Sequence, residues 1–429
     1  MQSHQDLAEP LPSESTDAEL EISENKLSDS IDLRAGNEQD PEPARHGPTP
    51  PADAELENKK PADESPESGL VSDNNTDDTK NLKDYIVHAP DLLQRMSKRD
   101  QDTRQQACLS KATGMSGRIG VHYQVIPPGF RTSVPHAHFA EDELVFCLQG
   151  RGIVWQNGWT YPFVPGDVAS WKAGTGITHT IINDTKHLPG ETTGEEEEDL
   201  ILLVVGEDKP DDDKMFYPFN PELYDVPGCE WEGPKQQNHW GQHPGVPRAE
   251  RPNETLPDVQ NGARPSNIIN WKDQLAEVGH GELSAYATSL SQETGLSGRF
   301  GCNLEVAPPG TRSSDPHAHS LEDELVFVIQ GEGLVWLDGQ VFPVSAGDAV
   351  GFKGGTGLAH TFINDSNALG GEGQDLVTWI VGENRRSEDR VVHPLHPEKK
   401  TTFKRWWEDP PKRKLGDHPG RPTKPYSLR

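Results

Sequence analysis

The sequence predicts an all-β protein in which two small β-barrels follow an acidic N-terminal tail. Short apolar runs, such as 144–148 and 200–205, are separated by Gly and Pro, and no segment between residues 113 and 205 shows sustained helical periodicity. Residues suited to hairpin turns stand between the runs, as in Gln156-Asn157-Gly158. Most of this pattern recurs in the second half of the chain. Many short strands at this spacing are typical of a small antiparallel barrel or a jelly roll.

The first 80 residues differ in composition from the rest of the chain. They contain no Phe, Trp or Tyr, and their 21 Asp and Glu residues against six Lys and Arg residues carry half of the formal net charge of −30. Such a segment cannot bury enough apolar area to offset the entropy that is lost on ordering. We therefore predict that residues 1–80 are a disordered acidic tail, which either solvates the protein or serves as a regulatory or docking segment.

An internal duplication organises the remainder of the chain. The segment 113–120 recurs as 294–301, and the same offset of 181 residues holds for about seventy residues. Between 136–184 and 317–365, 27 of 49 positions are identical, which indicates a repeat rather than a shared composition. The first copy then has a loop that is five residues longer and contains four consecutive glutamates, which we interpret as a solvated loop.

We expect the two repeats to form two domains. Residues 81–245 are predicted to make the first barrel together with a tail that wraps around it, and residues 266–429 are predicted to make the second in the same way. The segment 246–265 has no counterpart in the other copy. Because it is polar and contains Pro, we expect it to be the linker.

Composition argues against several classes of function. A net charge of −30 would repel a phosphate backbone, so nucleic-acid binding is not expected. The chain has no run of ~20 apolar residues, so no membrane span is expected either. Its start lacks the basic and apolar stretches of a secretory signal, and four cysteines do not make a disulfide framework. These observations favour a reducing compartment, with the cytoplasm as the expected location.

Each repeat holds the residues of a metal site. In a strand, residues i and i+2 point to the same face, so His136 and His138 should aim together, and His179 lies on a later strand. The second repeat has three histidines at the same spacing: His317, His319 and His360. Spacing alone favours Glu143 and Glu324 only weakly as the carboxylate ligands. Four neighbouring carboxylates compete with them: Glu141, Asp142, Glu322 and Asp323. Three imidazoles and one carboxylate suit Fe(II), Mn(II), Ni(II), Cu(II) or Zn(II), and an octahedral ion held in this way keeps two positions open.

These residues resemble the two signature motifs of the cupin superfamily. The first motif, Gly, a spacer, His-X-His, Glu and Gly, is matched at Gly129, His136, His138, Glu143 and Gly150, and again at Gly310, His317, His319, Glu324 and Gly331. The second motif is matched at Gly166, Gly176, His179 and Asn183, and again at Gly347, Gly357, His360 and Asn364. The resemblance implies a bicupin, in which each repeat is a jelly roll (a double-stranded β-helix) that holds one divalent metal ion. The metal ligands that it implies are His136, His138, Glu143 and His179 in the first repeat and His317, His319, Glu324 and His360 in the second.

Two features depart from the usual cupin pattern in both repeats. The spacer of the first motif is one residue longer, and the longer second motif has Gly174 and Gly355 where a Pro is common. Because both copies depart alike, we interpret the two departures as a trait of a subfamily rather than as decay of the motifs. Each half is similar to small, poorly characterised single-domain cupins, and not closely to bicupin oxalate decarboxylases or to quercetin or gentisate dioxygenases.

Three functions are compatible with this resemblance. The first is a metal-dependent oxidoreductase, in particular a dioxygenase with iron as the expected ion, ahead of Mn, Ni, Zn or Cu. The second is a non-redox isomerase, lyase or decarboxylase, in which the ion acts as a Lewis acid. The third is a binding or storage protein, against which the intact ligand sets of both repeats argue. The expected partner is a small organic molecule, the barrels are expected to pack on one another within the chain, and a homo-oligomer is left open. Catalytic residues other than the metal ligands are not identified.

One further residue recurs in both repeats, and another does not. Arg118 and Arg299 recur, and we expect a buried carboxylate partner to be the reason. His122 has Asn303 at its matched position, so any role of this histidine is confined to one barrel.

Overall fold

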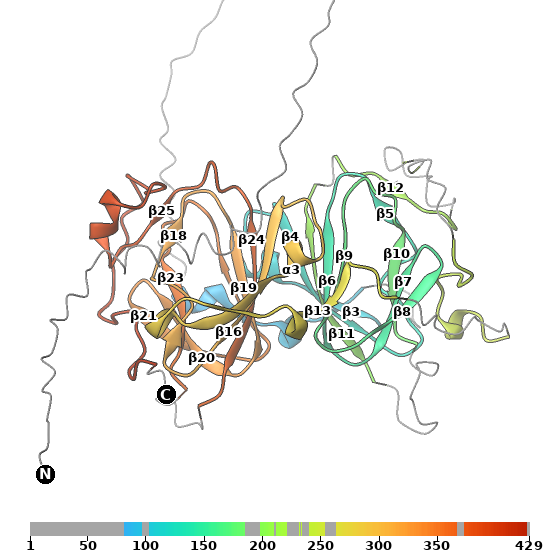
Figure 1. The fold of residues 1–429 in the computed structure, drawn as a ribbon, viewed down its shortest axis with the longest axis horizontal. Coiled ribbons are helices and arrows are strands. Elements are labelled where there is room, and N and C mark those ends of the chain that lie inside the picture. The colour runs from blue at the N-terminus through green and yellow to red at the C-terminus, as the bar shows by residue number, and fades with distance from the viewer. Residues whose placement is uncertain are drawn as a thin grey trace, which may run out of the picture.

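Figure 1 shows two β-barrels side by side in the computed structural model of the chain. The structure describes residues 81–96, 103–184, 198–209, 212–220, 231, 233, 240–253, 263–366 and 373–426. The predicted acidic tail, most of the glutamate-rich loop and part of the predicted linker lie outside the described residues. Within them, residues in strands far outnumber residues in helices, and the prediction of an all-β fold with two tandem jelly-roll barrels is confirmed.

The first barrel consists of a seven-stranded and a three-stranded antiparallel sheet. The order in the larger sheet is β13-β9-β6-β11-β4-β3-β2, and in the smaller sheet it is β10-β7-β8. The strands are β2 (Gln94–Arg95), β3 (Gln105–Cys108), β4 (Ile119–Ile126), β6 (Glu143–Gln149), β7 (Gly152–Gln156), β8 (Trp159–Phe163), β9 (Asp167–Trp171), β10 (His179–Ile182), β11 (Leu200–Glu207) and β13 (Ile268–Asn270). Apolar side chains from both sheets, among them Val145, Phe163 and Ile181, form the buried core of this barrel.

The second barrel repeats this architecture. Its larger sheet has the order β1-β22-β19-β24-β16-β15-β14, and its smaller sheet has the order β17-β23-β20-β21. The strands are β1 (Ile86–His88), β14 (Ala276–Val278), β15 (Ala285–Ser289), β16 (Phe300–Ala307), β17 (Thr311–Arg312), β19 (Glu324–Gln330), β20 (Glu332–Leu337), β21 (Gln340–Ser345), β22 (Asp348–Phe352), β23 (His360–Asn364) and β24 (Leu376–Glu383). Val326, Val335 and Phe362 belong to the core between its two sheets.

Small elements complete each barrel. A two-stranded pair joins β5 (Ala137–His138) to β12 (Met215–Phe216), and its counterpart joins β18 (Ala318–His319) to β25 (Val391–Val392). In the described part of the chain the helices are α2 (Leu109–Thr113) and α3 (Leu290–Glu293), with 3-10 turns η1 (Leu82–Tyr85), η2 (Ala89–Leu92), η4 (Arg248–Glu250), η5 (Trp271–Asp273), η6 (Gly281–Leu283) and η7 (Pro397–Thr401). Among the described residues, every helix is too short or too polar to cross a membrane.

One hairpin turn in each barrel also fixes the strand that carries the third histidine. Asn157 and Gly158 have φ angles of 48° and 81°, as a two-residue type I′ turn between β7 and β8 requires. The Oδ1 atom of Asn157 accepts hydrogen bonds of 2.9 Å from both the N–H and the hydroxyl of Thr178, the residue before β10. Asp338 holds the N–H of Ala359 before β23 in the same way, at 3.0 Å. The turn predicted from the sequence therefore also positions part of the site.

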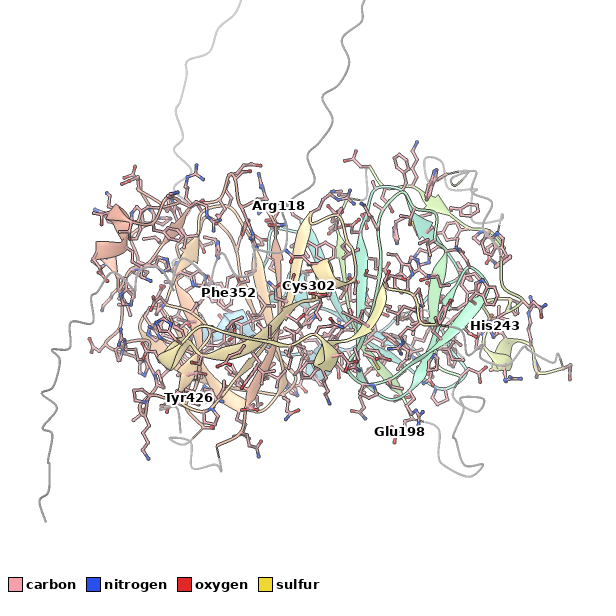
Figure 2. All side chains as sticks on the ribbon, viewed as in Figure 1. Arg118, Glu198, His243, Cys302, Phe352 and Tyr426 are labelled. Carbon is pink, nitrogen blue, oxygen red and sulfur yellow. The ribbon has the colours of Figure 1, made fainter. Side chains whose placement is uncertain are left out.

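The outer faces of the two large sheets pack against each other. On β4, alternate residues such as Val121 and Tyr123 point out of the first barrel, and on β16 the matched face carries Cys302 and Leu304. Together with side chains of the other large-sheet strands they form one buried cluster that spans both barrels. Cys302 is labelled in Figure 2, where the two barrels meet. The two barrels therefore share a core within one chain.

Each repeat also contributes a strand to the sheet of the other repeat. The N-terminal strand β1 pairs with β22 of the second barrel, and β13 pairs with β9 of the first barrel. The pairings are equivalent, since Ile86 lies opposite Val350 and Ile268 lies opposite Ala169. Ala169 and Val350 are matched positions under the repeat offset of 181. In Figure 1 the blue N-terminal segment accordingly lies against the orange and red barrel, and the yellow β13 lies against the green one. The domain boundaries proposed from the sequence follow the chain, whereas the sheets exchange these two strands.

Candidate metal centres

The four predicted ligands of the first repeat converge inside the first barrel. His138 ends β5, Glu143 begins β6 and His179 begins β10. His136 forms an isolated antiparallel bridge with His179. One ligand atom from each of the four side chains lies within 4.8 Å of all the others. The Oε2 atom of Glu143 lies 3.2, 3.6 and 3.9 Å from the Nε2 atoms of His138, His179 and His136, respectively.

The second repeat brings three of its four predicted ligands into an equally tight group. Ligand atoms of His317, Glu324 and His360 all lie within 4.8 Å of one another, and Glu324 Oε1 is 3.2 Å from His360 Nε2. The fourth residue, His319, has its Nε2 atom 3.9 Å from Glu324 Oε2 but is not within 4.8 Å of all three. The second site thus has the same arrangement, except that the imidazole of His319 lies further from the other ligand atoms.

The competing carboxylates of both repeats have other partners. The side chains of Glu141 and Glu322 accept hydrogen bonds from backbone N–H groups that follow β11 and β24. Asp142 and Asp323 have fully buried side chains that bond across the boundary between the barrels. The carboxylates that lie among the histidines are those that begin β6 and β19, and their assignment as ligands stays a prediction.

Every histidine of the two clusters has a hydrogen-bond acceptor for its Nδ1 atom. Four of these histidines donate to the carbonyl oxygen two residues earlier: His136 at 2.9 Å, His179 at 3.1 Å, His317 at 3.0 Å and His360 at 3.4 Å. The other two donate to carboxylates, His138 to Asp213 at 2.6 Å and His319 to Asp389 at 2.8 Å. Because Nδ1 carries the proton, the lone pair of Nε2 is free to bind an ion.

Burial and charge set the protonation states of the clusters. Burial and the neighbouring imidazoles lower the pKa of His136 to about 3, and the same causes hold the pKa of His317 well below its usual value. Burial alone would raise the pKa of Glu143 and Glu324, but contacts with the histidines lower it, to about 2 for Glu324. Neutral imidazoles and an ionised carboxylate are the forms that bind a metal. In addition, His179 Nε2 is buried with no hydrogen-bond partner among the described residues, and a bound ion would satisfy it.

Asp213 and Asp389 are functional candidates that the sequence reasoning missed. Burial would lower the pKa of His138, but its hydrogen bonds to Asp213 and Glu143 raise it to about 10, so this position favours a positive charge that a divalent ion can supply. Asp213 is held in turn by the N–H of Ala140 at 2.7 Å. The two aspartates recur between the repeats at an offset of 176, as do other residues after the glutamate-rich loop. This recurrence was the sequence signal that could have identified them.

Replacing either aspartate by asparagine is expected to weaken metal binding in its own barrel about 10-fold to 100-fold, because the amide no longer fixes the imidazole as a carboxylate does. The measurement is a competition titration of Mn(II) with a chelator, on Asp213→Asn and Asp389→Asn. Asp212→Asn is the matched control, since Asp212 lies on the same turn with an exposed side chain. Equal affinities of Asp213→Asn and Asp212→Asn would contradict the role.

The comparison with known families adds a decisive observation to this geometry. The cupin domain family matches the chain twice, over residues 122–192 and over residues 303–369, and each match contains one complete set of predicted ligands. The chain is a bicupin. The resemblance seen in the motifs is confirmed, and with its two His and Glu clusters the chain is a metal-binding bicupin.

Solved structures with a similar arrangement have low sequence identity to this bicupin. One is Bacillus subtilis oxalate decarboxylase, a protein with Mn(II) centres, at 14% identity and a TM-score of 0.43, covering 72% of this chain and 79% of that chain. Another is vicilin from Corylus avellana (hazelnut), at 14% identity and a TM-score of 0.42, covering 72% of this chain and 88% of that chain. No curated protein matches the sequence.

The surroundings of the two centres of the bicupin are alike in one respect and different in another. An aromatic ring stacks on the third histidine of each barrel: Trp171 on His179 with centroids 3.8 Å apart, and Phe352 on His360 at 3.6 Å. The position beside the first histidine differs, because the first barrel has Tyr217 there and the second has His393. The Nδ1 atom of His393 is buried with no hydrogen-bond partner among the described residues.

The barrel interiors differ at one more matched position. On β4, Gln124 points away from the shared core and donates a hydrogen bond of 2.9 Å to Gln106. The residue at the same place on β16 of the second barrel is Glu305. Its Oε1 atom is buried with no hydrogen-bond partner among the described residues. Burial raises the pKa of Glu305 to about 8, and the charge of Glu324 adds to this effect. The second barrel therefore contains a carboxylic acid that is neutral at pH 7, whereas the first contains an amide.

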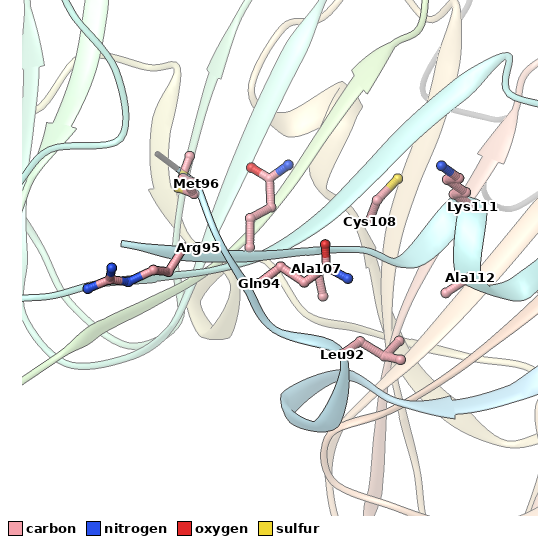
Figure 3. A pocket seen from close by; sticks show the side chains of 9 residues that line it. Leu92, Gln94, Arg95, Met96, Ala107, Cys108, Lys111 and Ala112 are labelled. Atoms are coloured by element: carbon pink, nitrogen blue, oxygen red, sulfur yellow. The ribbon is translucent and has the colours of Figure 1, made fainter. Parts of the chain in front are cut away.

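A separate pocket lies at the edge of the first barrel, next to β3 (Figure 3). Its volume is about 600 Å³, and Arg95, Cys108 and Lys111 are among the residues that line it. A hydrogen bond with His122 lowers the pKa of the Cys108 thiol to about 7, although burial opposes this effect. None of the predicted metal ligands lines this pocket, so it is distinct from the metal centres.

Proposed function

We propose that this bicupin is a metal-dependent enzyme that moves a proton on a small oxygen-bearing organic substrate in its second barrel, without consuming an oxidant. The proposed reaction class is that of the isomerases, lyases and decarboxylases. The observation that carries the proposal is Glu305 inside the barrel, whose carboxyl group has a raised pKa and a buried Oε1 atom without a hydrogen-bond partner among the described residues. A neutral carboxylic acid with a pKa near the working pH suits a general acid.

The predicted ligands give the chain a way to bind and orient such a substrate. In the second barrel, His317, His319, Glu324 and His360 would hold the ion. When bound, the ion supplies a Lewis acid that polarises a carbonyl or carboxylate oxygen. Phe352 and Asp389 keep the rings of two of these histidines in place. The unpartnered Nδ1 atom of His393, on the wall beside His317, is available to a polar group of the substrate.

Glu305 would then exchange a proton with the substrate. In its neutral form it can donate from a position in the barrel interior, and the partner-free Oε1 atom is ready to accept a hydrogen bond when the proton has moved. The first barrel has an amide there, which cannot donate a proton in this way. We therefore assign the proton-transfer reaction to the second barrel, and metal binding to both.

An iron dioxygenase is the competing proposal, and the donor set supports it. Three imidazoles and a carboxylate bind Fe(II) as well as Mn(II), and the predicted ligands are alike in both barrels. Iron was the ion expected from the sequence. Under this proposal, turnover consumes one O2 for each substrate molecule, and Glu305 is not needed for the reaction with oxygen.

Turnover in the presence and absence of oxygen separates the two proposals. The purified chain is loaded with Mn(II) or Fe(II) and incubated with a panel of small oxo, hydroxy and dicarboxylic acids, while NMR follows the products and an electrode follows O2. We expect product formation without O2 uptake, at the same rate in anaerobic buffer. A requirement for O2 in stoichiometric amounts would instead establish the dioxygenase.

A further inference from the structure

The residues that immediately precede the carboxylate ligands are held by the opposite barrel. Asp323 stands directly before Glu324, and its side chain is fully buried. Both the N–H and the hydroxyl of Ser116, from the first repeat, donate to Asp323 Oδ2 at 2.6 Å. Arg118, also from the first repeat, reaches Asp323 Oδ1 at 3.3 Å and the carbonyl oxygen of Leu321 at 2.8 Å. Figure 2 labels Arg118 at the boundary between the barrels.

The reciprocal contacts hold the first centre from the second repeat. Asp142 stands directly before Glu143, and its side chain is fully buried too. The N–H of Ser297 donates to Asp142 Oδ2 at 3.0 Å, and its hydroxyl donates to the same oxygen. Arg299 donates to Asp142 Oδ1 at 2.9 Å and to the carbonyl oxygen of Ala140 at 2.9 Å. The expectation that the recurring arginines have buried carboxylate partners is met, and each partner belongs to the other repeat.

Both aspartates are also tied to the loop that supports the second histidine of their own barrel. Asp323 Oδ1 accepts from the N–H of Gly354 at 2.9 Å, and the N–H of the next residue, Gly355, donates to the carbonyl oxygen of His319 at 3.0 Å. In the first barrel, Asp142 accepts from Ala173 at 2.9 Å, and the residue after Ala173 donates to the carbonyl oxygen of His138 at 2.9 Å. One buried carboxylate thus connects the backbone of two predicted ligands in each barrel.

A second ion pair strengthens each of these crossed contacts. Arg118 binds Glu383 with two hydrogen bonds of 2.7 Å, and Glu383 in turn accepts from the N–H of Asp323 at 3.0 Å. Arg299 makes the corresponding bond of 2.7 Å to Glu207. A bidentate guanidinium–carboxylate pair is geometrically specific, so it fixes the backbone at the start of the strand that carries the glutamate ligand.

We propose that the Ser116 to Arg118 segment is a positioning element of the second metal centre, and that Ser297 to Arg299 is a positioning element of the first. The affinity of each centre for its ion is then set partly from the other repeat. Metal sites need their ligands within about 0.5 Å of the productive geometry, so loss of one of these contacts acts on the ligand set. Removing the arginine also leaves a buried aspartate without its counter-charge. The inference rests on the proposed metal centres.

The test measures each centre separately in the full chain. His136→Ala leaves the second centre, and His317→Ala leaves the first; each parent is titrated with Mn(II), and bound ion is followed by electron paramagnetic resonance. Arg118→Gln is then added to both parents. We expect at least a tenfold loss of affinity at the second centre and less than a twofold change at the first. Arg299→Gln is expected to give the opposite pattern, and each Arg→Lys variant is expected to recover part of the loss.

Two controls keep the result interpretable. Arg151→Gln changes an exposed arginine on a turn of the first barrel and should alter neither centre. If an arginine variant fails to fold, Ser116→Ala and Ser297→Ala remove only a hydroxyl from the same aspartate and are expected to give a smaller loss with the same crossed pattern. A loss of affinity mainly at the centre in the arginine's own repeat, or an equal loss at both centres, would overturn the inference but leave metal binding established. Parents that bind no Mn(II) would overturn the metal centres and this inference together.

Discussion

His317→Ala and His136→Ala are each expected to reduce the bound metal from two equivalents per chain to one, and the double variant is expected to bind none. Changes to residues that only support a ligand cost about 10-fold to 100-fold in affinity, so removal of a ligand should cost more. In both histidines Nδ1 donates to a backbone carbonyl oxygen, so Nε2 is the atom left to bind the ion, and an alanine has no such atom. Elemental analysis after dialysis against metal-free buffer gives the stoichiometry directly.

The two variants should differ in activity although they lose the same amount of metal. If proton transfer occurs in the second barrel, His317→Ala abolishes turnover, whereas His136→Ala retains most of it. His122→Ala is the matched control, because this histidine lies on β4 of the first barrel and belongs to neither cluster. Unchanged metal content in both single variants would rule out the predicted ligand sets.

Glu305→Gln is expected to lower kcat by about 10²-fold to 10⁴-fold, the usual contribution of a general acid, while metal binding is retained. The substitution keeps the shape of the side chain and reproduces the residue that the first barrel has at this position. The sign of the pH dependence follows from the pKa of about 8: the proton is present below that value and lost above it. Activity of the unaltered enzyme should therefore fall about tenfold per pH unit above pH 8, and the residual activity of the variant should not show this decline.

Glu332→Gln provides the control for this prediction, because Glu332 lies in the second barrel with an exposed side chain. It should leave both kcat and the pH profile unchanged. An unaltered kcat in Glu305→Gln, or a rate that rises above pH 8, would exclude Glu305 as the acid. The metal content of both variants is measured alongside, so that a loss of ion is not mistaken for a loss of the proton donor.

The repeat made much of this architecture predictable from the sequence. Strand alternation and hairpin residues such as Asn157 are local features, and the motif residues His136 and Glu143 keep their spacing in both copies. Two features could not be predicted, because they depend on the contact between the barrels. Nothing in the spacing of Arg118 shows that its aspartate belongs to the other repeat, and the exchange of β1 and β13 has no local signature.

Glu305 shows a different limit of sequence reasoning. In the sequence, position 305 is one more polar residue in the alternation of a strand, and Gln and Glu are interchangeable at the surface of many proteins. Its significance depends on burial and on the nearby charge of Glu324, which only the assembled barrel supplies. Asp213, in contrast, could have been found by aligning the two copies, since it recurs as Asp389 once the offset changes to 176.

The exchanged strands bear on how such a chain could arise. Two equivalent surfaces that each lend a strand to the other form an isologous contact, the kind made by two identical subunits around a twofold axis. A single-copy ancestor with this strand arrangement would have left an open sheet edge on every monomer, and association with a second molecule would have closed it. Gene fusion would then have joined the two subunits of a pre-existing homodimer in one chain. After fusion, the matched positions 124 and 305 could change independently, so that one half carries Gln and the other Glu.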